Sequence, residues 1–290
     1  MPRKRKRSKV LGRIILLLLG AYLGLNAALA YSFLHREKPA IPTNSPFAKL
    51  TLACEGHSDE IFVTAKLAKK DPAVHKVMIF VPGLGGSPEI FFDTMKKLEA
   101  KGIESMTVPL MGHPMNGQKF FGFGMRDADD VLAAVKWVHD RVPVQSTIGL
   151  YGVSMGGTAV WYATVREPQQ IDVTISEGGV HDLRSVIPEW LNSYIPGGSI
   201  ILSPEMVFAR IMSGVNPNDV DLTEPLTRVR PRKGLVIHGE KDTNVPMAHG
   251  MQLSEDSGAP LYRSKPSAHA DALEKDQDAI IAKLIQLMGD

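Results

Sequence analysis

Residues 146–157 read STIGLYGVSMGG, and this stretch decides the fold. Its first six residues predict a buried strand, and the apolar spacing from Met155 onward predicts a helix. Gly152 and Gly156 stand two residues before and after Ser154, where side chains would collide in a sharp strand-to-helix turn. Such a turn lifts the Ser154 hydroxyl clear of the sheet, toward the free N–H groups of the helix. A glycine-rich turn with an incidental serine is the alternative interpretation.

Strand and helix patterns alternate on both sides of this turn. Short apolar and β-branched runs predict strands at Leu50–Cys54, Glu60–Leu67, Val77–Val81, Glu104–Leu110, Ile171–Ser176, Leu235–His238 and Pro260–Arg263. A turn at Gly56–Asp59 is expected between the first two strands. Apolar residues at helical spacing predict helices at Pro88–Lys101, Arg126–Arg141, Met155–Arg166, Met247–Glu255 and Leu273–Met288. This order predicts an α/β protein with a doubly wound, mostly parallel sheet and helices on both faces. In such sheets the functional residues lie beyond the carboxyl ends of the strands.

Two further strand ends carry side chains suited to catalysis. Asp242 follows the strand that ends at His238, where a carboxylate can orient an imidazole; a turn-forming or helix-capping aspartate is the alternative. His269 lies between the last strand and the last helix, and it can act on Ser154 only if its loop reaches the turn. His238 itself is expected to be buried structure. Other histidines compete for the role of base: His113, His181 and His249.

The order serine, aspartate, histidine resembles the α/β-hydrolase superfamily over about residues 50–288. The resemblance rests on three features, which are the Gly152–Gly156 turn, the His238–Asp242 segment and the late His269. Because of Pro217–Val229, the chain looks most similar to the branch of dienelactone hydrolases and prolyl-oligopeptidase-like enzymes, which includes relatives with one N-terminal membrane helix. The resemblance implies a Ser154 nucleophile, a His269 base and an orienting Asp242. It implies no metal and no organic cofactor.

The oxyanion hole is expected to consist of backbone N–H groups. Met155 should supply one, as the residue after the nucleophile. Leu84 should supply the second, because Pro82–Gly86 reads PGLGG directly after a predicted strand, and glycines allow the backbone to approach closely. Pro82 stands where many relatives have a histidine. Phosphate binding is the alternative role for this glycine run. The run lacks the lysine of the G-x-x-x-x-G-K-[ST] motif and the spacing of the G-x-G-x-x-G motif, both of which bind nucleotides.

Composition and charge exclude several classes of protein. Hydrophobic residues make up 44% and charged residues 22% of the 290, which excludes wholesale disorder and a multi-spanning membrane protein. The single cysteine, Cys54, excludes an intramolecular disulfide and a cysteine-based zinc cluster. The first 30 residues hold seven basic residues and no acid, and the remainder holds 26 basic against 31 acidic residues. We therefore expect no nucleic-acid partner.

The N-terminus joins a basic run to an apolar one. Residues 1–13 are basic and should remain cytoplasmic, whereas residues 14–34 are uncharged and long enough to span a lipid bilayer. This pattern predicts a single-pass anchor with an extracytoplasmic domain. A cleaved signal peptide is the alternative, because Ala28–Ala30 fits a cleavage site, and the product would then be secreted or periplasmic. Residues 35–49, with three prolines, predict a linker.

Residues 50–290 are then expected to form the hydrolase domain, with a small apolar, helical cap inserted at about 184–228. The expected function is a serine hydrolase that cleaves a small carboxylic ester or acyl compound through an acyl-enzyme. A serine peptidase or amidase on the same residues is one alternative. A non-catalytic, membrane-tethered binding module is another, and the sequence indicates no oligomeric state.

Overall fold

An eight-stranded sheet forms the centre of the molecule. The computed structural model describes residues 2–34, 41–120 and 122–289. The strands are β1 (Ala48–Cys54), β2 (His57–Val63), β3 (Lys76–Val81), β4 (Glu104–Thr107), β5 (Thr147–Val153), β6 (Val173–Glu177), β7 (Lys233–Gly239) and β8 (Leu261–Ser264). Their spatial order is β1-β2-β4-β3-β5-β6-β7-β8. β2 runs antiparallel to both of its neighbours, and all strands from β4 to β8 run parallel.

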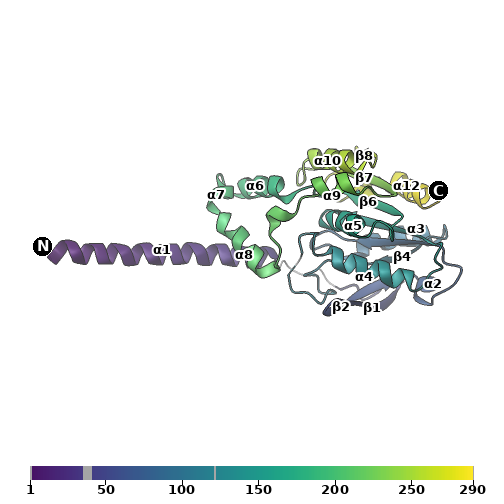
Figure 1. Ribbon diagram of the computed structural model, residues 1–290, viewed down its shortest axis with the longest axis horizontal. Helices are drawn as coiled ribbons and strands as arrows, with labels where there is room; N and C mark the ends of the chain where they lie inside the picture. Colours follow the sequence, from purple (N-terminus) through teal and green to yellow (C-terminus); the bar gives the residue numbers. More distant parts are fainter. Residues whose placement is uncertain (1, 35–40, 121, 290) are drawn as a thin grey trace.

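Helices cover both faces of this sheet (Figure 1). The helices α4 (Ala128–His139), α5 (Met155–Arg166) and α10 (Met247–Ser257) lie on one face, and α3 (Phe92–Glu99) and α12 (Gln277–Gly289) lie on the other. Alternate residues of β3 belong to the two cores, with Ile79 in the first and Phe80 in the second. The predicted doubly wound α/β fold is confirmed. Short elements complete this part: α2 (Ala65–Ala68), the 3₁₀ turn η1 (Pro88–Phe91) and α11 (Ala272–Lys275).

The element boundaries differ from the sequence prediction in two instructive places. The predicted turn at 56–59 is wrong, because β1 and β2 form a hairpin with a two-residue turn at Glu55 and Gly56. The φ of Gly56 is +76°, a value that suits glycine in tight hairpin turns. The predicted strand Glu104–Leu110 ends at Thr107, since Pro109 has no N–H for the ladder.

A helical insertion separates β6 from β7, where the sequence predicts a cap. We call residues 183–228 the cap. It consists of α6 (Leu183–Tyr194), α7 (Gly198–Ile201), α8 (Ser203–Ser213), the 3₁₀ turn η2 (Pro217–Asp219) and α9 (Thr223–Arg228). Apolar side chains of α7 and α8 remain exposed, among them Ile200, Val207 and Ile211.

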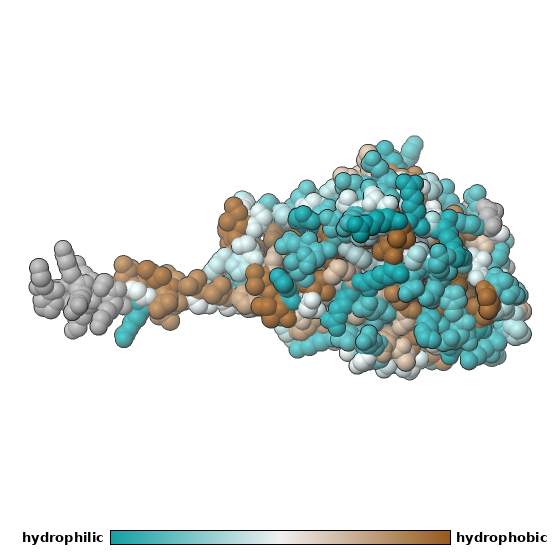
Figure 2. All heavy atoms as spheres, viewed as in Figure 1, coloured by the Kyte–Doolittle hydropathy of each residue, from teal (hydrophilic) through white to brown (hydrophobic). Residues whose placement is uncertain are grey.

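The N-terminal helix α1 (Pro2–Leu34) projects from the body, and its last turns pack against it (Figure 1). Asn26, Ala30 and Leu34 lie four residues apart on one face and are buried. The helix packs along α8, and the hydroxyl of Tyr22 donates a hydrogen bond to the carbonyl O of Ile201. The projecting part carries apolar side chains on its surface (Figure 2). By length and composition, the stretch from residue 10 to residue 34 is sufficient to cross a membrane.

Candidate active site

Ser154 occupies the sharp turn between β5 and α5. Its φ and ψ are 54° and −118°, a backbone region that residues other than glycine rarely adopt. A Cβ on Gly152 would lie 2.2 Å from the carbonyl O of Gly156. A Cβ on Gly156 would lie 2.4 Å from the carbonyl oxygens of Val81 and Pro82. Both positions therefore require glycine, because the turn leaves no room for a side chain.

Three side chains that are distant in sequence form one chain of hydrogen bonds. Oγ of Ser154 lies 2.8 Å from Nε2 of His269. Nδ1 of His269 lies 2.8 Å from Oδ2 of Asp242. The structure thus brings together the serine, the histidine and the aspartate that the sequence singles out. In this arrangement an imidazole can accept the hydroxyl proton while the carboxylate stabilises the positive ring.

Asp242 is held as an acceptor by its surroundings. Its Oδ1 accepts hydrogen bonds from the backbone N–H groups of Asn244 and Val245, both at 2.9 Å. Burial by itself would raise the pKa of Asp242, but the hydrogen bonds from His269 and Val245 outweigh it and keep the pKa below its usual value. The carboxylate is therefore ionised at neutral pH.

His238 is buried beneath the acid, as predicted. Its Nε2 lies 2.9 Å from the carbonyl O of Val245 and 3.5 Å from Oδ2 of Asp242. Burial lowers the pKa of His238, so its ring is neutral at pH 7 and donates to the carbonyl. His238 supports the turn that carries Asp242.

The loop that carries His269 is hydrogen-bonded to the loop that carries Asp242. The backbone N–H of Lys241 donates to the carbonyl O of Ser267 at 2.9 Å. The hydroxyls of Ser264 and Ser267 are 2.6 Å apart, and both residues are buried. Ala270, which follows the histidine, has a φ of 58°. The direction of the imidazole therefore depends on constrained backbone.

Glu177, at the end of β6, links the turn that carries Ser154 to the segment after His269. Its carbonyl accepts the backbone N–H of Ser154 at 2.7 Å. Its carboxylate accepts hydrogen bonds from the Tyr151 hydroxyl and from the N–H of Ala272, the latter at 2.7 Å. Burial raises the pKa of Glu177. Sequence reasoning missed this residue, although an acid at a strand end before two glycines was a usable signal.

Gly178 is the second residue that sequence reasoning missed. It has a φ of +57°, and a Cβ there would lie 3.5 Å from Nδ1 of His269 and 3.6 Å from Oδ2 of Asp242. The chain after β6 thus passes directly beside the histidine–aspartate pair. A glycine at this position combines the left-handed backbone with space for both side chains.

The residues expected to form the oxyanion hole lie near Ser154. Met155 is the first residue of α5, where a backbone N–H has no acceptor within the helix. A Cβ on Gly83 would lie 3.2 Å from Cβ of Ser154 and 3.8 Å from its Oγ, so the PGLGG loop adjoins the serine. Leu84 follows Gly83 in this loop.

The cap contacts the loop that carries Asp242, and the three histidines that compete with His269 for the role of base have other partners. Nε1 of Trp190, on α6, donates to the carbonyl O of Asn244 at 2.6 Å. Nε2 of His181 lies 2.7 Å from Oδ2 of Asp256, and the N–H of His181 donates to Nδ1 of His249. The backbone N–H of Met115 donates to Nδ1 of His113 at 3.1 Å. Away from this site, one group of described residues brings together side chains that could hold a metal ion: Cys54, His57, Asp59 and Asp130.

Solved structures share this fold. An esterase Pf2001 from Pyrococcus furiosus superposes with a TM-score of 0.67 at 16% identity, over 87% of this chain and 98% of its own. The esterase Est1E from Butyrivibrio proteoclasticus gives 0.61 at 18% identity, over 83% and 99% of the two chains. A 2-hydroxy-6-oxo-6-phenylhexa-2,4-dienoate hydrolase from Rhodococcus sp. strain RHA1 gives 0.62 at 16% identity, over 85% and 100%.

Fold and site together define an α/β hydrolase, as the sequence resemblance implies. The sequence model of the prolyl oligopeptidase family matches residues 90–256, which is more than half of the chain. The chain therefore belongs to the prolyl oligopeptidase family. The matched region contains Ser154 and Asp242 but ends before His269. A search of curated proteins found no significant sequence match.

Proposed function

We propose that this protein is a serine hydrolase that cleaves carboxylic esters. The observation that carries the proposal is the continuous hydrogen-bond chain from Ser154 through His269 to Asp242, with both distances at 2.8 Å. His269 removes the hydroxyl proton as Ser154 attacks the carbonyl carbon, and the N–H groups of Met155 and Leu84 stabilise the oxyanion. The imidazolium then protonates the leaving alcohol, and water releases the acid from the acyl-enzyme.

Esters are the proposed substrates because an alkoxide leaves more easily than an amine anion. A peptidase or amidase on the same three residues is the second candidate, and the match to the prolyl oligopeptidase family favours it. Turnover of p-nitrophenyl esters against aminoacyl p-nitroanilides separates the two. A kcat/KM higher for the anilides would replace the ester proposal by the peptidase.

The catalytic role of Ser154 is tested by Ser154→Ala. We expect hydrolysis of p-nitrophenyl butyrate and labelling by a fluorophosphonate to be lost together. Ser58→Ala, at an exposed serine of β2, is the matched control and should keep wild-type activity. Unchanged hydrolysis by purified Ser154→Ala would refute the mechanism, and a wild-type protein that neither hydrolyses nor labels would instead be the non-catalytic binding module.

We also propose that α1 is an uncleaved, single-pass anchor with a cytoplasmic N-terminus. Cleavage near Ala30 would remove Asn26 and Ala30, which are buried, and would leave Leu34 without these two neighbours on the same helix face. The mature protein should therefore be found in the membrane fraction. Its intact mass should include the N-terminal residues. A soluble product that begins at Tyr31 would identify a signal peptide instead.

A further inference from the structure

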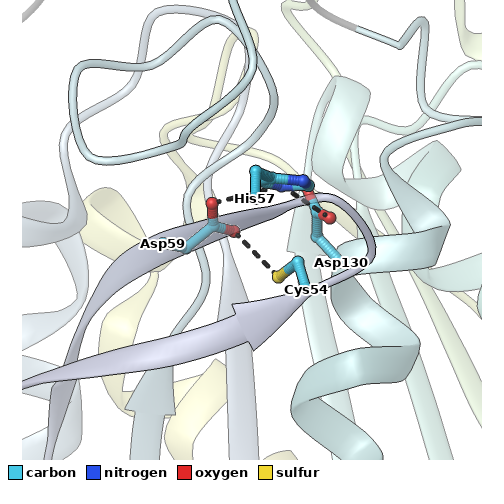
Figure 3. A group of neighbouring side chains, drawn as sticks. All are labelled: Cys54, His57, Asp59 and Asp130. Carbon is cyan, nitrogen blue, oxygen red and sulfur yellow. Dashed lines mark hydrogen bonds and ion pairs between the residues drawn. The ribbon is translucent and has the colours of Figure 1, made fainter.

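Four side chains with metal-ligating atoms converge beside the β1–β2 hairpin (Figure 3). Cys54 ends β1, His57 and Asp59 lie on β2, and Asp130 comes from α4. The side chains of His57, Asp59 and Asp130 are 7%, 0% and 2% exposed, and Cys54 is half-buried. These residues take no part in the proposed hydrolysis.

The spacing of the four groups fits a small tetrahedral metal ion. Nε2 of His57 lies 3.4 Å from Oδ1 of Asp59 and 3.2 Å from Oδ1 of Asp130. Sγ of Cys54 lies 3.6 Å from Oδ2 of Asp59. All four ligand atoms lie within 4.8 Å of one another. Tetrahedral zinc, with bonds of about 2.0–2.3 Å, separates its ligand atoms by roughly 3.3–3.8 Å, so binding would need only small movements.

In the part of the chain that the structure describes, His57 is the only side chain that forms ion pairs with Asp59 and Asp130. Burial, and then the charge of Asp130, raise the pKa of Asp59 to about 7. Burial likewise raises the pKa of Asp130 and of the Cys54 thiol. Among the described residues, Nε2 of His57 is buried without a hydrogen-bond partner of acceptable geometry, and it faces the two carboxylates. A divalent ion would satisfy this nitrogen and offset the repulsion between the carboxylates.

A second layer of hydrogen bonds orients the prospective ligands. Nδ2 of Asn116 donates to Oδ2 of Asp59 at 3.1 Å and to Oδ2 of Asp130 at 2.8 Å. The N–H of Gly117 donates to Oδ1 of Asp59. Nδ1 of His57 lies 3.1 Å from the carbonyl O of Glu55 and 3.1 Å from Nε2 of Gln118. In the tautomer that donates to Glu55, the lone pair of Nε2 faces the carboxylates, which is the tautomer that a metal ion at Nε2 would select. Such outer hydrogen bonds are usual in metal sites.

We propose that Cys54, His57, Asp59 and Asp130 bind a structural Zn²⁺ ion. A thiolate, an imidazole and two carboxylates are ligands that zinc accepts, and four protein ligands close its tetrahedral shell. The ion would join the hairpin to the N-terminal half of α4 and, through Asn116, to the segment between β4 and α4. The site is independent of the proposed hydrolysis.

The first test uses the full chain in detergent, stripped with a chelator and then titrated with ZnCl₂. We expect one zinc per chain and a rise in the unfolding temperature of roughly 5–10 °C at a zinc concentration a hundredfold above the dissociation constant. Co²⁺ should replace Zn²⁺ and give a thiolate-to-metal charge-transfer band. This measurement needs no variant, so it does not depend on whether a mutated chain folds.

Variants then assign the ligands. Asp130→Asn should weaken zinc binding by at least about 100-fold, and Asn116→Ala by about 10–100-fold. Cys54→Ala should abolish the cobalt charge-transfer band, whereas Ser58→Ala, on the same hairpin, should leave stoichiometry and affinity unchanged. Wild-type protein that binds no zinc, or whose zinc binding and unfolding temperature are the same in Asp130→Asn and Cys54→Ala, would overturn the proposal. The four side chains would then be a metal-free hydrogen-bonded cluster.

Discussion

Replacing Asp242 by asparagine should slow ester hydrolysis by about 10⁴ in kcat while the fold persists. The N–H groups of Asn244 and Val245, both 2.9 Å from Oδ1, require an acceptor, so the amide oxygen takes that place. The new NH₂ group then faces Nδ1 of His269, which must accept and carry its proton on Nε2. A ring in this tautomer cannot remove the Ser154 proton. The loss corresponds to about 5.4 kcal/mol of transition-state stabilisation.

The assay for Asp242→Asn is kcat on p-nitrophenyl butyrate, with thermal unfolding as the measure of fold. Asp278→Asn makes the same chemical change at an exposed residue of α12 and should have wild-type kcat. A folded Asp242→Asn enzyme that keeps more than a tenth of wild-type kcat would show that the tautomer argument is wrong.

Three further predictions concern packing and pH. Gly156→Ala should lower kcat by about 10–100-fold and the free energy of unfolding by about 1–3 kcal/mol, because its Cβ would lie 2.4 Å from the carbonyl O of Val81; wild-type kcat and urea midpoint would contradict this. Burial lowers the pKa of His249, so the unfolded chain binds more protons and stability should fall as the pH drops below about 6.5. Urea unfolding at pH 7.5 and 5.5 measures this loss, which His249→Gln should reduce; equal losses in both proteins would exclude His249 as the cause. Deletion of residues 1–34 removes the buried Leu34 and should lower the unfolding temperature by several degrees; an unchanged temperature would mean that α1 does not stabilise the body.

Local sequence predicts much of the fold, because strand and helix patterns here are strong and glycines separate them. The helix Met155–Arg166 has the predicted bounds. The order of the strands in the sheet cannot be read from local sequence. The handedness of the crossovers and the alternation of strands and helices nevertheless restrict it to a doubly wound arrangement. The hairpin turn was misplaced because Gly56 alone carries the signal, and His57 and Asp59 look like turn residues until they are paired with β1.

Part of the candidate site also follows from local sequence, and part does not. Ser154 has a local signal in its flanking glycines, and Asp242 and His269 follow from their places after strands. The role of Glu177 depends on three partners that only the assembled sheet brings to it.

The cluster around Cys54 had no local signal either. Asp130 is far from the hairpin in sequence, and the single cysteine excluded only a cysteine-based zinc cluster. The expectation of no metal came from the hydrolase resemblance, whose mechanism needs none, and it did not consider a site with a single cysteine.

The packing of α1 against the body has a consequence for the proposed anchor. At 1.5 Å per residue, its 33 residues form a rod of about 50 Å. Its last turns contact the body directly. If α1 is the anchor proposed above, this packing, and not the length of the linker predicted at 35–49, sets the distance between body and bilayer. Glycine–serine residues inserted into that stretch should therefore leave the distance and the tilt of the candidate site relative to the bilayer unchanged. In that case a rigid helix, and not a flexible linker, holds the body at the membrane.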